Sequence, residues 1–299
     1  ALAGYEAFCR RAVHAPPQHP LWVRSWMMAT GADMIVVALR RDGRALVQMV
    51  LEVVTSGPCR IARFPGGKHA NGNFVAAAHG ATALTAAERR ALAAAIRNAR
   101  PDIDLVRLER QNPHHDGTPN VLAGMATMRS PNVSLAVDLD GGFAAVLSRS
   151  GGKRKRKKFK TQLRKFEEAG GHRLYEAETP EEAERLINEF FVMKAARLRE
   201  RGIPNVFGPP EVQAFFRRLF CEAVEQQPAP FVLHGVEVAG EIRAVNGLSV
   251  TGHSFVCEFG GIREDASGSS PGFFLDYTNI EQACETGRKL YDLSVGDED

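Results

Sequence analysis

Three side chains near the carboxyl-terminal end of the chain could act as a general base in a group-transfer reaction. They are His253, Glu258 and Asp292, which lie in or beside segments whose pattern predicts β-strands. Glu258 interrupts an otherwise apolar strand, and a carboxylate in an apolar setting tends to have a raised pKa. Such a group could take a proton from an amine or a hydroxyl. Glu258 is therefore the first candidate, whereas His253 and Asp292 also suit ordinary structural roles.

A segment of small residues that follows Glu258 could hold a phosphate group. Pro271 is a favoured first residue of a helix, and Ser270 before it is a favoured N-cap. Backbone N–H groups at the start of a helix attract anions. The segment also fits the G-x-S-x-G pattern of serine hydrolases, but no predicted strand leads directly into its serine. We assign to phosphate or pyrophosphate binding the residues Arg263, Gly268, Ser269, Ser270 and Gly272.

One segment makes the whole protein basic. Nine of the thirteen residues from Lys153 to Lys165 are Lys or Arg, whereas the net charge of the chain is only +3. Phe159, Leu163 and Phe166 fall at helical spacing, so we predict an amphipathic helix with a solvated basic face. That face suits an anionic small molecule or a nucleotide-linked donor. Nucleic acid and a membrane surface are the alternatives.

The composition excludes several other classes of protein. With 299 residues, 44% of them hydrophobic and 24% charged, the chain is typical of a globular protein with room for two domains. It contains no apolar run long enough to span a bilayer and no secretory signal at its start, so we expect a cytoplasmic protein. Its five cysteines include no Cys-x-x-Cys pair, so we expect neither a disulfide framework nor a metal site.

The first half of the chain predicts a sheet with one helix. Four segments have the apolar, β-branched pattern of strands: residues 33–40, 45–54, 59–64 and 103–108. Asp42 and Gly43 form the hairpin signal between the first two segments. Thr85 and Glu88 form a capping box, so a helix is expected to follow Thr85.

The second half repeats this order of elements. Its predicted strands are residues 231–238, 242–250, 254–259 and 289–293, and a helix begins at Pro271 between the last two. Ala239 and Gly240 form its first turn. Two helices that begin at Thr179 and after Pro210 are expected to cover this second sheet. The repeated order suggests a duplication, with one domain over residues 1–142 and another over residues 143–299.

The second half resembles the CelD-like family, a set of GNAT-superfamily acetyltransferases linked by name to bacterial cellulose biosynthesis. The architecture is also similar to that of FemAB-type aminoacyl transferases. The resemblance covers roughly residue 143 to the end of the chain, with a looser fit from Trp22 onward. It rests on a basic helix followed by a series of spaced residues: Gly170, Lys194, Arg197, Ser270, Pro271, Gly272, Gly287, Asp292, Gly296, Asp297 and Glu298.

The resemblance implies an α/β (α+β) fold of two tandem GNAT-like domains, each with a mixed, mainly antiparallel sheet flanked by helices. It also implies that acetyl-coenzyme A, or another acyl-coenzyme A, is the donor substrate. The pyrophosphate of the donor would lie at the helix start over residues 268–272, or in the first half at the loop before Thr85. Ala266 stands where the usual family motif has its first glycine.

The sequence therefore predicts a cytoplasmic acyltransferase. Its acceptor would be an amine or a hydroxyl group of a small molecule, a glycan or a peptide. We expect the acceptor to lie in a cleft between the two halves, and we assign Lys194 and Arg197 to its binding. One alternative is a FemAB-like transferase that uses aminoacyl-tRNA, with the basic helix holding RNA phosphates. The other is a non-catalytic GNAT-like module that binds nucleic acid or another ligand.

Overall fold

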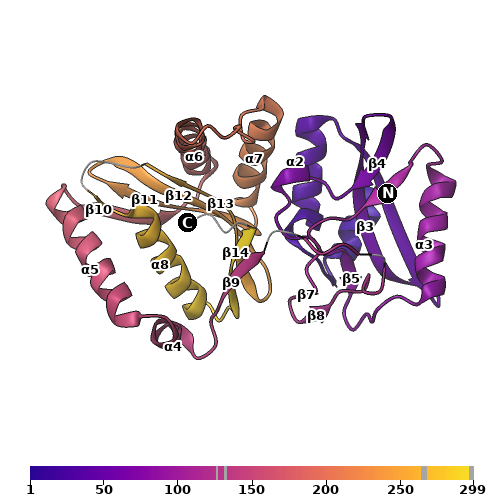
Figure 1. Cartoon of the computed structure of the whole chain (residues 1–299), viewed down its shortest axis with the longest axis horizontal. Helices are drawn as coiled ribbons and strands as arrows, with labels where there is room; N and C mark the ends of the chain where they lie inside the picture. Colours follow the sequence, from indigo (N-terminus) through magenta and orange to yellow (C-terminus); the bar gives the residue numbers. More distant parts are fainter. Residues whose placement is uncertain (126, 131–132, 264–267, 296–299) are drawn as a thin grey trace. The chain divides into compact units, whose positions relative to one another are not determined.

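Each half of the chain builds its own six-stranded sheet (Figure 1). The structure is a computed structural model that describes residues 1–125, 127–130, 133–263 and 268–295. It divides into two units, residues 1–133 and residues 134–299. The sequence analysis placed the boundary after residue 142. The difference arises because β9 (Ser134–Asp138) pairs with β14 (Leu290–Val295), a strand of the second unit.

The first unit is a mixed sheet with three α-helices among its described residues. The strands of this sheet are β1 (Ala12–Val13), β2 (Asp33–Arg41), β3 (Arg44–Ser56), β4 (Cys59–Arg63), β5 (Ala76–Ala78) and β6 (Leu105–Arg107). Its order is β1-β5-β3-β4-β6, with β2 also paired to β3, and a separate small ribbon joins β7 (His114–His115) to β8 (Thr118–Pro119). The helices are α1 (Leu2–Cys9), α2 (Pro20–Thr30) and α3 (Ala86–Ala99), with short 3-10 helices η1 (Pro16–Gln18) and η2 (Gly67–His69).

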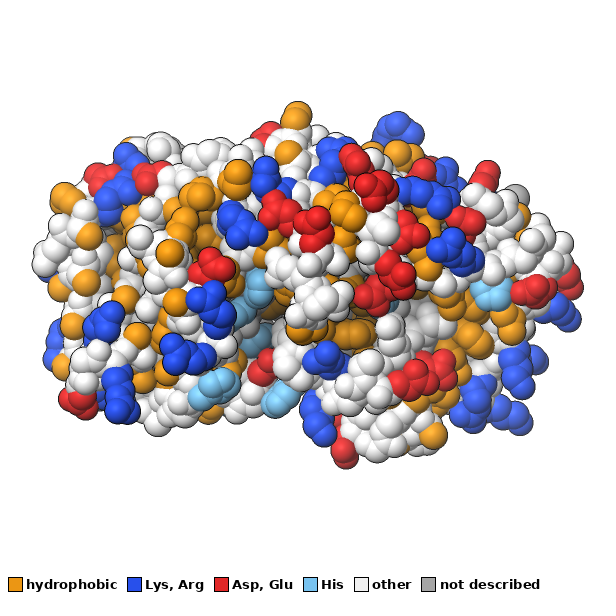
Figure 2. Space-filling view, turned by 180° about the vertical axis from the view of Figure 1, so that it is seen from behind, with side chains coloured by type: hydrophobic (Ala, Val, Ile, Leu, Met, Phe, Trp, Pro, Cys, Tyr) orange, Lys and Arg blue, Asp and Glu red, His pale blue; other side chains and the backbone are white. Residues whose placement is uncertain are grey.

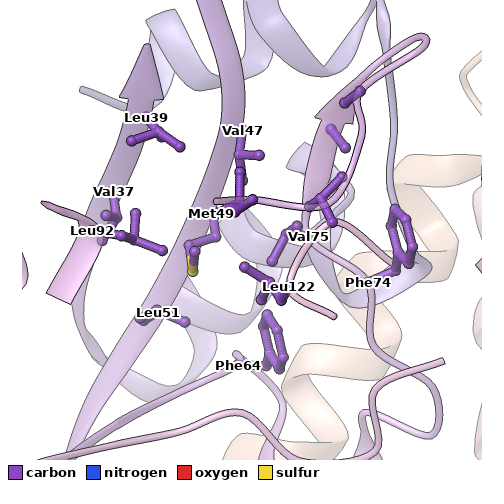
Figure 3. Packing of buried hydrophobic residues seen from close by; sticks show 14 of the residues in the cluster. Val37, Leu39, Val47, Met49, Leu51, Phe64, Phe74, Val75, Leu92 and Leu122 are labelled. Carbon is purple, nitrogen blue, oxygen red and sulfur yellow. The ribbon is translucent and has the colours of Figure 1, made fainter. Parts of the chain in front are cut away.

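The main core of the first unit joins one face of its sheet to α3 and the loops around it (Figure 3). Val37 and Leu39 of β2 belong to the same buried cluster as Leu92 and Ile96 of α3. The helix begins with the predicted capping box: Thr85 Oγ1 accepts from the backbone N–H of Glu88 at 3.2 Å, and Glu88 Oε2 accepts from the backbone N–H of Thr85 at 2.8 Å. The capping prediction is therefore confirmed.

The second unit holds a longer sheet and larger helices. Its strands are β9, β10 (His172–Glu176), β11 (Phe231–Val238), β12 (Glu241–Val250), β13 (Ser254–Ile262) and β14, in the order β10-β11-β12-β13-β14-β9. Its helices are α4 (Gly142–Arg149), α5 (Gly152–Glu168), α6 (Pro180–Glu200), α7 (Pro210–Ala223) and α8 (Pro271–Glu285). As expected, α6 and α7 pack on β11, β12 and β13. In Figure 1, α8 lies on the opposite face from α6 and α7.

The predicted repeat of elements is confirmed in three dimensions. In each unit an antiparallel hairpin leads to a third strand, then to a helix, then to a strand that pairs in parallel with the third: β4 with β6, and β13 with β14. The two hairpin turns also share a backbone conformation. Asp42 and Gly43 have φ of 51° and 77°, and Ala239 and Gly240 have φ of 51° and 83°. Two successive residues with positive φ match the right-handed twist of a hairpin.

A cluster of phenylalanines fills the space between the second sheet and helices α6 and α7. Phe259 of β13 is stacked on Phe190 of α6 with ring centroids 4.0 Å apart, and it meets Phe216 and Phe220 of α7 edge-on at 5.2 and 5.5 Å. The ring lies directly over Gly247 of β12: a Cβ at that glycine would come within 2.2 Å of it. A side chain at position 247 would therefore displace the ring from the core.

The basic segment forms the predicted helix, α5, and packs through aromatic rings. The Phe159 ring lies 4.6 Å from that of Phe274 and 4.2 Å from that of Tyr277, both on α8. Phe166 is buried and lies 5.0 Å from Phe274. Leu163, the third expected anchor, is 36% exposed. Phe159 and Phe166 thus anchor the apolar face of α5 to α8. The Lys and Arg side chains lie on the opposite face of the helix.

Charges of both signs mix over much of the surface. On the face shown in Figure 2, Lys and Arg side chains stand among Asp and Glu side chains. Ion pairs such as Arg185 with Glu237, 2.7 Å apart, account for part of this mixture. Among the described residues, no helix combines the length and the apolar character that crossing a membrane requires.

Candidate transferase site

The parallel pairing between β13 and β14 is short. It covers three residue pairs and ends at Val256 with Asp292. On its other side β14 pairs with β9 from Leu290 to Val295, with an irregularity between Asp292 and Val295, while β13 runs on to Ile262. Within the described residues, the far part of β13 therefore has no strand beside it on the β14 side. An open strand edge offers backbone N–H and C=O groups to an extended ligand.

Glu258 lies at a β-bulge in β13 beside this opening. Gly247 of β12 pairs with Phe259 and Leu248 pairs with Cys257, so Glu258 is the extra residue between them. Its side chain is 7% exposed, and its Oε1 accepts a hydrogen bond from Ser249 Oγ at 2.6 Å. A strand bulge is thus present at the predicted base. Bulges re-aim side chains and leave backbone groups outside the ladder.

A second carboxylate, which the sequence analysis missed, belongs to α8. Asp276 Oδ1 accepts hydrogen bonds from Asn246 Nδ2 at 2.7 Å and from Tyr291 Oη at 3.4 Å. Burial raises the pKa of Asp276, and the hydrogen bonds from Asn246 and Tyr291 offset part of that rise. The sequence held a signal for this residue. Asp276 and Asn279 follow Gly272 at helical spacing on a face that is otherwise apolar.

Cys257 marks the point at which these groups come together. Burial is the main cause that raises the pKa of its thiol, and the carboxylates of Asp276, Glu258 and Asp292 raise it further. Lys194 on α6 acts in the opposite direction. The charges of Glu258, Asp292, Lys194 and Asp276 therefore all act on this one residue of β13. The thiol itself stays protonated and is unsuited to act as a nucleophile.

The raised pKa of Asp276 predicts a pH-dependent effect of its replacement by Asn. The folded state binds the Asp276 proton more tightly than the unfolded chain does. The free energy of unfolding therefore falls as the pH rises above 3.8, the ordinary pKa of an aspartate. The difference in melting temperature, D276N minus wild type, should become more positive between about pH 4 and about pH 7. Thermal unfolding at several pH values checks this. A difference that stays constant across the range contradicts it.

The other two base candidates lie in different surroundings. His253 is exposed in the turn before β13, and its backbone carbonyl accepts from the N–H groups of Lys289 and Leu290 at 2.7 and 3.2 Å. Glu258 lies five positions further along the chain, roughly 16 Å away. Asp292 Oδ1 accepts from the backbone N–H of Ser294 at 2.7 Å, at the bend of β14. A catalytic role for either residue stays a prediction.

The predicted phosphate segment does lead into a helix, which starts at Pro271 with Ser270 as its N-cap residue. The backbone N–H of Ser270 donates to Oε1 of Gln162, a buried residue of α5, at 2.7 Å. Lys165 of α5 donates to the carbonyl of Gly268 at 2.9 Å. Ser269 lies between these two contacts. The basic helix therefore supplies a cation to this loop, which the sequence did not indicate.

Arg263 and Gly272 have structural roles at the two ends of the same loop. The Arg263 guanidinium pairs with Glu189 of α6 at 2.6 Å. A Cβ at Gly272 would come within 2.4 Å of the Ile262 side chain, so any larger residue there would require that side chain to shift. Ala266, and the Gly296, Asp297 and Glu298 of the family resemblance, lie outside the described residues.

Lys194 and Arg197 lie on successive turns of α6, as the predicted helix requires. Lys194 Nζ lies 5.9 Å from the centre of the Phe207 ring, and its charge acts on Cys257. The solvent face of α5 is hollowed and cationic. It borders a depression of about 490 Å³ that is lined by Lys153, Arg156, Lys157, Lys160, Thr161 and Arg164.

Comparison with known families finds one whose model resembles most of the second unit. Residues 153–299 match the family described as acetyltransferase (GNAT) domain. No curated protein matches the chain in sequence. The sequence match and the short parallel pair beside a bulged strand concern the same part of the molecule. Residues 153–299 are thus similar in sequence to GNAT-type acetyltransferase domains.

Solved structures share the fold over the whole chain. A FemX structure aligns with a TM-score of 0.66 and 12% identity, and it covers 100% of this chain and 89% of its own. The C-terminal domain of an Agrobacterium fabrum protein assigned as lysylphosphatidylglycerol synthetase aligns with a TM-score of 0.55 and 13% identity, over 99% and 80% of the two chains. L-PGS from Bacillus licheniformis aligns with a TM-score of 0.51 and 11% identity, over 93% of this chain and 76% of its own.

These findings confirm the predicted fold class, two GNAT-like domains in tandem. At such identities the structural likenesses concern the fold alone. The CelD-like assignment stays a prediction.

Proposed function

We propose that the second unit transfers an acyl group from an acyl-coenzyme A, with acetyl-coenzyme A as the first candidate, to an amine or a hydroxyl. One observation carries the proposal: in a domain that matches GNAT acetyltransferases, the β13–β14 pair opens beside a bulge that holds a buried carboxylate. In the opening, the donor can bind along the edge of β13. A backbone N–H at the bulge can donate to the donor's carbonyl oxygen, and Glu258 can act as the base for the acceptor.

Residues at the start of α8 suit the phosphates of the donor. Lys165 already reaches Gly268, and Arg263 borders the same loop. The backbone N–H groups of the first turn add to the positive potential, since Pro271 and Gly272 begin a fifteen-residue helix. In this proposal Lys165 and the helix start hold the pyrophosphate, while Lys194 and Arg197 contact the acceptor.

The proposed reaction needs two proton transfers, one from the acceptor to Glu258 and one to the departing sulfur, and no cofactor chemistry. Glu258 takes the proton from the acceptor nitrogen or oxygen as that atom attacks the donor carbonyl. The tetrahedral oxyanion receives hydrogen bonds from backbone N–H groups near the bulge. The C–S bond then breaks, and coenzyme A leaves as the thiol after taking up a proton. Holding donor and acceptor in line would supply much of the rate enhancement.

Thermal unfolding of the full chain with and without acetyl-coenzyme A, longer acyl-coenzyme A and coenzyme A tests the donor. A ligand at one hundred times its dissociation constant stabilises the fold by about 2.7 kcal/mol. We expect a rise in melting temperature with the coenzyme A compounds and a smaller rise in the variant K165E. The matched control K289E, next to the start of β14, should show the same rise in melting temperature as the wild type. No shift with any of these compounds contradicts the proposed donor.

A second candidate, aminoacyl transfer, is favoured by the cationic face of α5. The neighbours include FemX and a protein named for joining lysine to phosphatidylglycerol, so the shared fold is compatible with transfer of amino acids. Five cations in a row along α5 would hold a chain of phosphates, such as that of aminoacyl-tRNA. Salt-dependent tRNA binding without any response to coenzyme A would favour this candidate. Failure to bind either donor would favour a non-catalytic ligand-binding module.

The acceptor is the least specified part of the proposal. A resemblance to the CelD-like family would place it in polysaccharide or cell-envelope metabolism, as a glycan, a peptide or a small precursor.

A further inference from the structure

The departing sulfur of the proposed acyl transfer needs a proton from a group other than Glu258. Glu258 holds the proton of the acceptor, and its side chain bonds to Ser249 of β12. Asn246 lies three positions before Ser249 in the same strand, so the two side chains point to opposite faces of the sheet. The face that carries Asn246 holds a second carboxyl group, that of Asp276.

Asp276 of α8 lies over β13, where that strand separates from β14. Its Oδ1 atom accepts from Asn246 Nδ2 of β12 at 2.7 Å and from Tyr291 Oη of β14 at 3.4 Å. In the sheet, β13 lies between β12 and β14. Asn246 pairs with Gly260, and Tyr291 pairs with Phe255, so the carboxyl group is tied to both ends of this stretch of β13. The parallel pairing with β14 ends within the same stretch.

Gly260 keeps this face of the open edge clear of a side chain. It pairs with Asn246, so a side chain at position 260 would point to the face of Asn246 and Asp276. A Cβ at Gly260 would come within 3.1 Å of Asn246 Oδ1. Because glycine has no side chain, the pair of Asn246 and Asp276 is not screened from the edge of β13 at this position.

The hydrogen bonds of Asp276 suit a protonated carboxyl group. Both bonds end on Oδ1, and within the described part of the chain Oδ2 makes none. In a carboxylic acid, Oδ1 would be the carbonyl oxygen, which can accept two bonds, and Oδ2 would carry the hydrogen. Asp276 is partly exposed, so a ligand can reach it. Burial is the main cause that raises the pKa of this carboxyl group, which favours the same protonated form.

Two titratable neighbours of Asp276 hold their protons more tightly. They are the Cys257 thiol of β13 and the Tyr291 hydroxyl of β14, and burial is the main cause that raises the pKa of each. The ordinary pKa of a thiol, about 8.5, lies well above that of a carboxyl group. Proton transfer from Asp276 to a thiolate is therefore favourable, even though burial weakens the acid.

We propose that Asp276 is the acid that protonates the departing sulfur of coenzyme A. The assignment rests on the acyl transfer proposed above. When the C–S bond breaks, its electron pair passes to the sulfur, and the hydrogen of Asp276 Oδ2 follows to give the free thiol. The carboxylate that remains keeps its hydrogen bonds from Asn246 and Tyr291. Glu258 holds the proton of the acceptor, and exchange of one proton with water at each carboxyl group restores the starting state.

The release of coenzyme A from acetyl-coenzyme A tests the assignment, with hydroxylamine as the probe acceptor because this small amine stays unprotonated at neutral pH. We expect kcat of the wild type to fall as the pH rises through the pKa of Asp276, because only the protonated carboxyl group can donate. The variant D276N keeps the size of the side chain. It should lower kcat by about tenfold or more at the pH of maximal activity and lose the fall at higher pH.

Two further measurements separate this chemical role from donor binding. D276N should keep the rise in melting temperature that acetyl-coenzyme A causes in the wild type. The control D140N, the same change at an exposed residue between β9 and α4, should match the wild type in kcat and in its dependence on pH.

A second variant, Y291F, tests the same assignment without changing the carboxyl group. The hydrogen bond from Tyr291 lowers the pKa of Asp276. Its loss should raise that pKa and move the fall of kcat to higher pH, an effect that a purely structural role would not produce. The assignment is overturned if D276N keeps wild-type kcat and pH dependence, or if Y291F leaves the fall of kcat in place; the acyl transfer then still stands. A wild type that neither binds nor cleaves acetyl-coenzyme A would contradict the proposed function itself, and the assignment with it.

Discussion

Replacing Glu258 with Gln is expected to lower the turnover of acyl transfer by about 10²–10⁴-fold while leaving donor binding unchanged. The amide keeps the size of the side chain and can still accept the hydrogen bond from Ser249 Oγ. It cannot take a proton from the acceptor. Steady-state kinetics with acetyl-coenzyme A, together with the thermal shift that this donor causes, would measure the two effects separately.

The control for this variant is E241Q, a change of the same kind at an exposed residue at the start of β12. It should keep wild-type turnover. If E258Q retains full activity, Glu258 is not the base, and its buried carboxylate serves only to hold Ser249. If E258Q loses the donor shift as well, the residue supports the local structure of β13 rather than the chemistry.

Replacing Phe259 with Ala is expected to destabilise the second unit by about 3–5 kcal/mol. The ring is 5% exposed and touches four other phenylalanines, which are Phe190, Phe207, Phe216 and Phe220. Its loss would leave a cavity between the sheet and two helices, because Gly247 beneath it has no side chain that could fill the space. Urea unfolding followed by far-UV circular dichroism would measure the effect.

Val192 on α6 offers a comparison within the same unit. Its side chain is 56% exposed, so V192A should change the free energy of unfolding by about 0.5 kcal/mol or less. A loss of less than about 1 kcal/mol in F259A would mean that the aromatic cluster collapses around the gap. The importance of Phe259 for holding β13, and with it Glu258, would then be smaller than its contacts suggest.

The predicted elements agree closely with the structure where local signals are strong. The strand predicted over residues 231–238 is β11, and the helix expected after Thr179 is α6, which begins at Pro180. Alternating apolar residues, caps and turn residues act over a few positions, so a single sequence reveals them. Weak local signals failed. The short strand β10 and the N-terminal helix α1 were not predicted, because tertiary packing stabilises them. Helix α2 was missed although Pro20 at its first turn and Gly31 at its C-cap are local signals.

The candidate site was predicted only in part. Glu258 could be found because a charge in an apolar strand stands out along the chain. Asp276 could not be ranked beside it, because its importance comes from Asn246 and Tyr291, which belong to other strands. His234 and Glu176 are likewise far apart in sequence, and only the pairing of β10 with β11 brings them together.

The sequence by itself determined the two repeats, their hairpin turns, the capped helices and the basic helix. Each of these depends on contacts within about one turn of helix or one hairpin. The tertiary structure decided which side chains meet: Asp276 with Asn246, Lys165 with the loop before α8, and His234 with Glu176. Such meetings depend on strand order, on a bulge that shifts the register, and on the helix that covers the sheet. No local pattern encodes them, because their partners lie many residues apart.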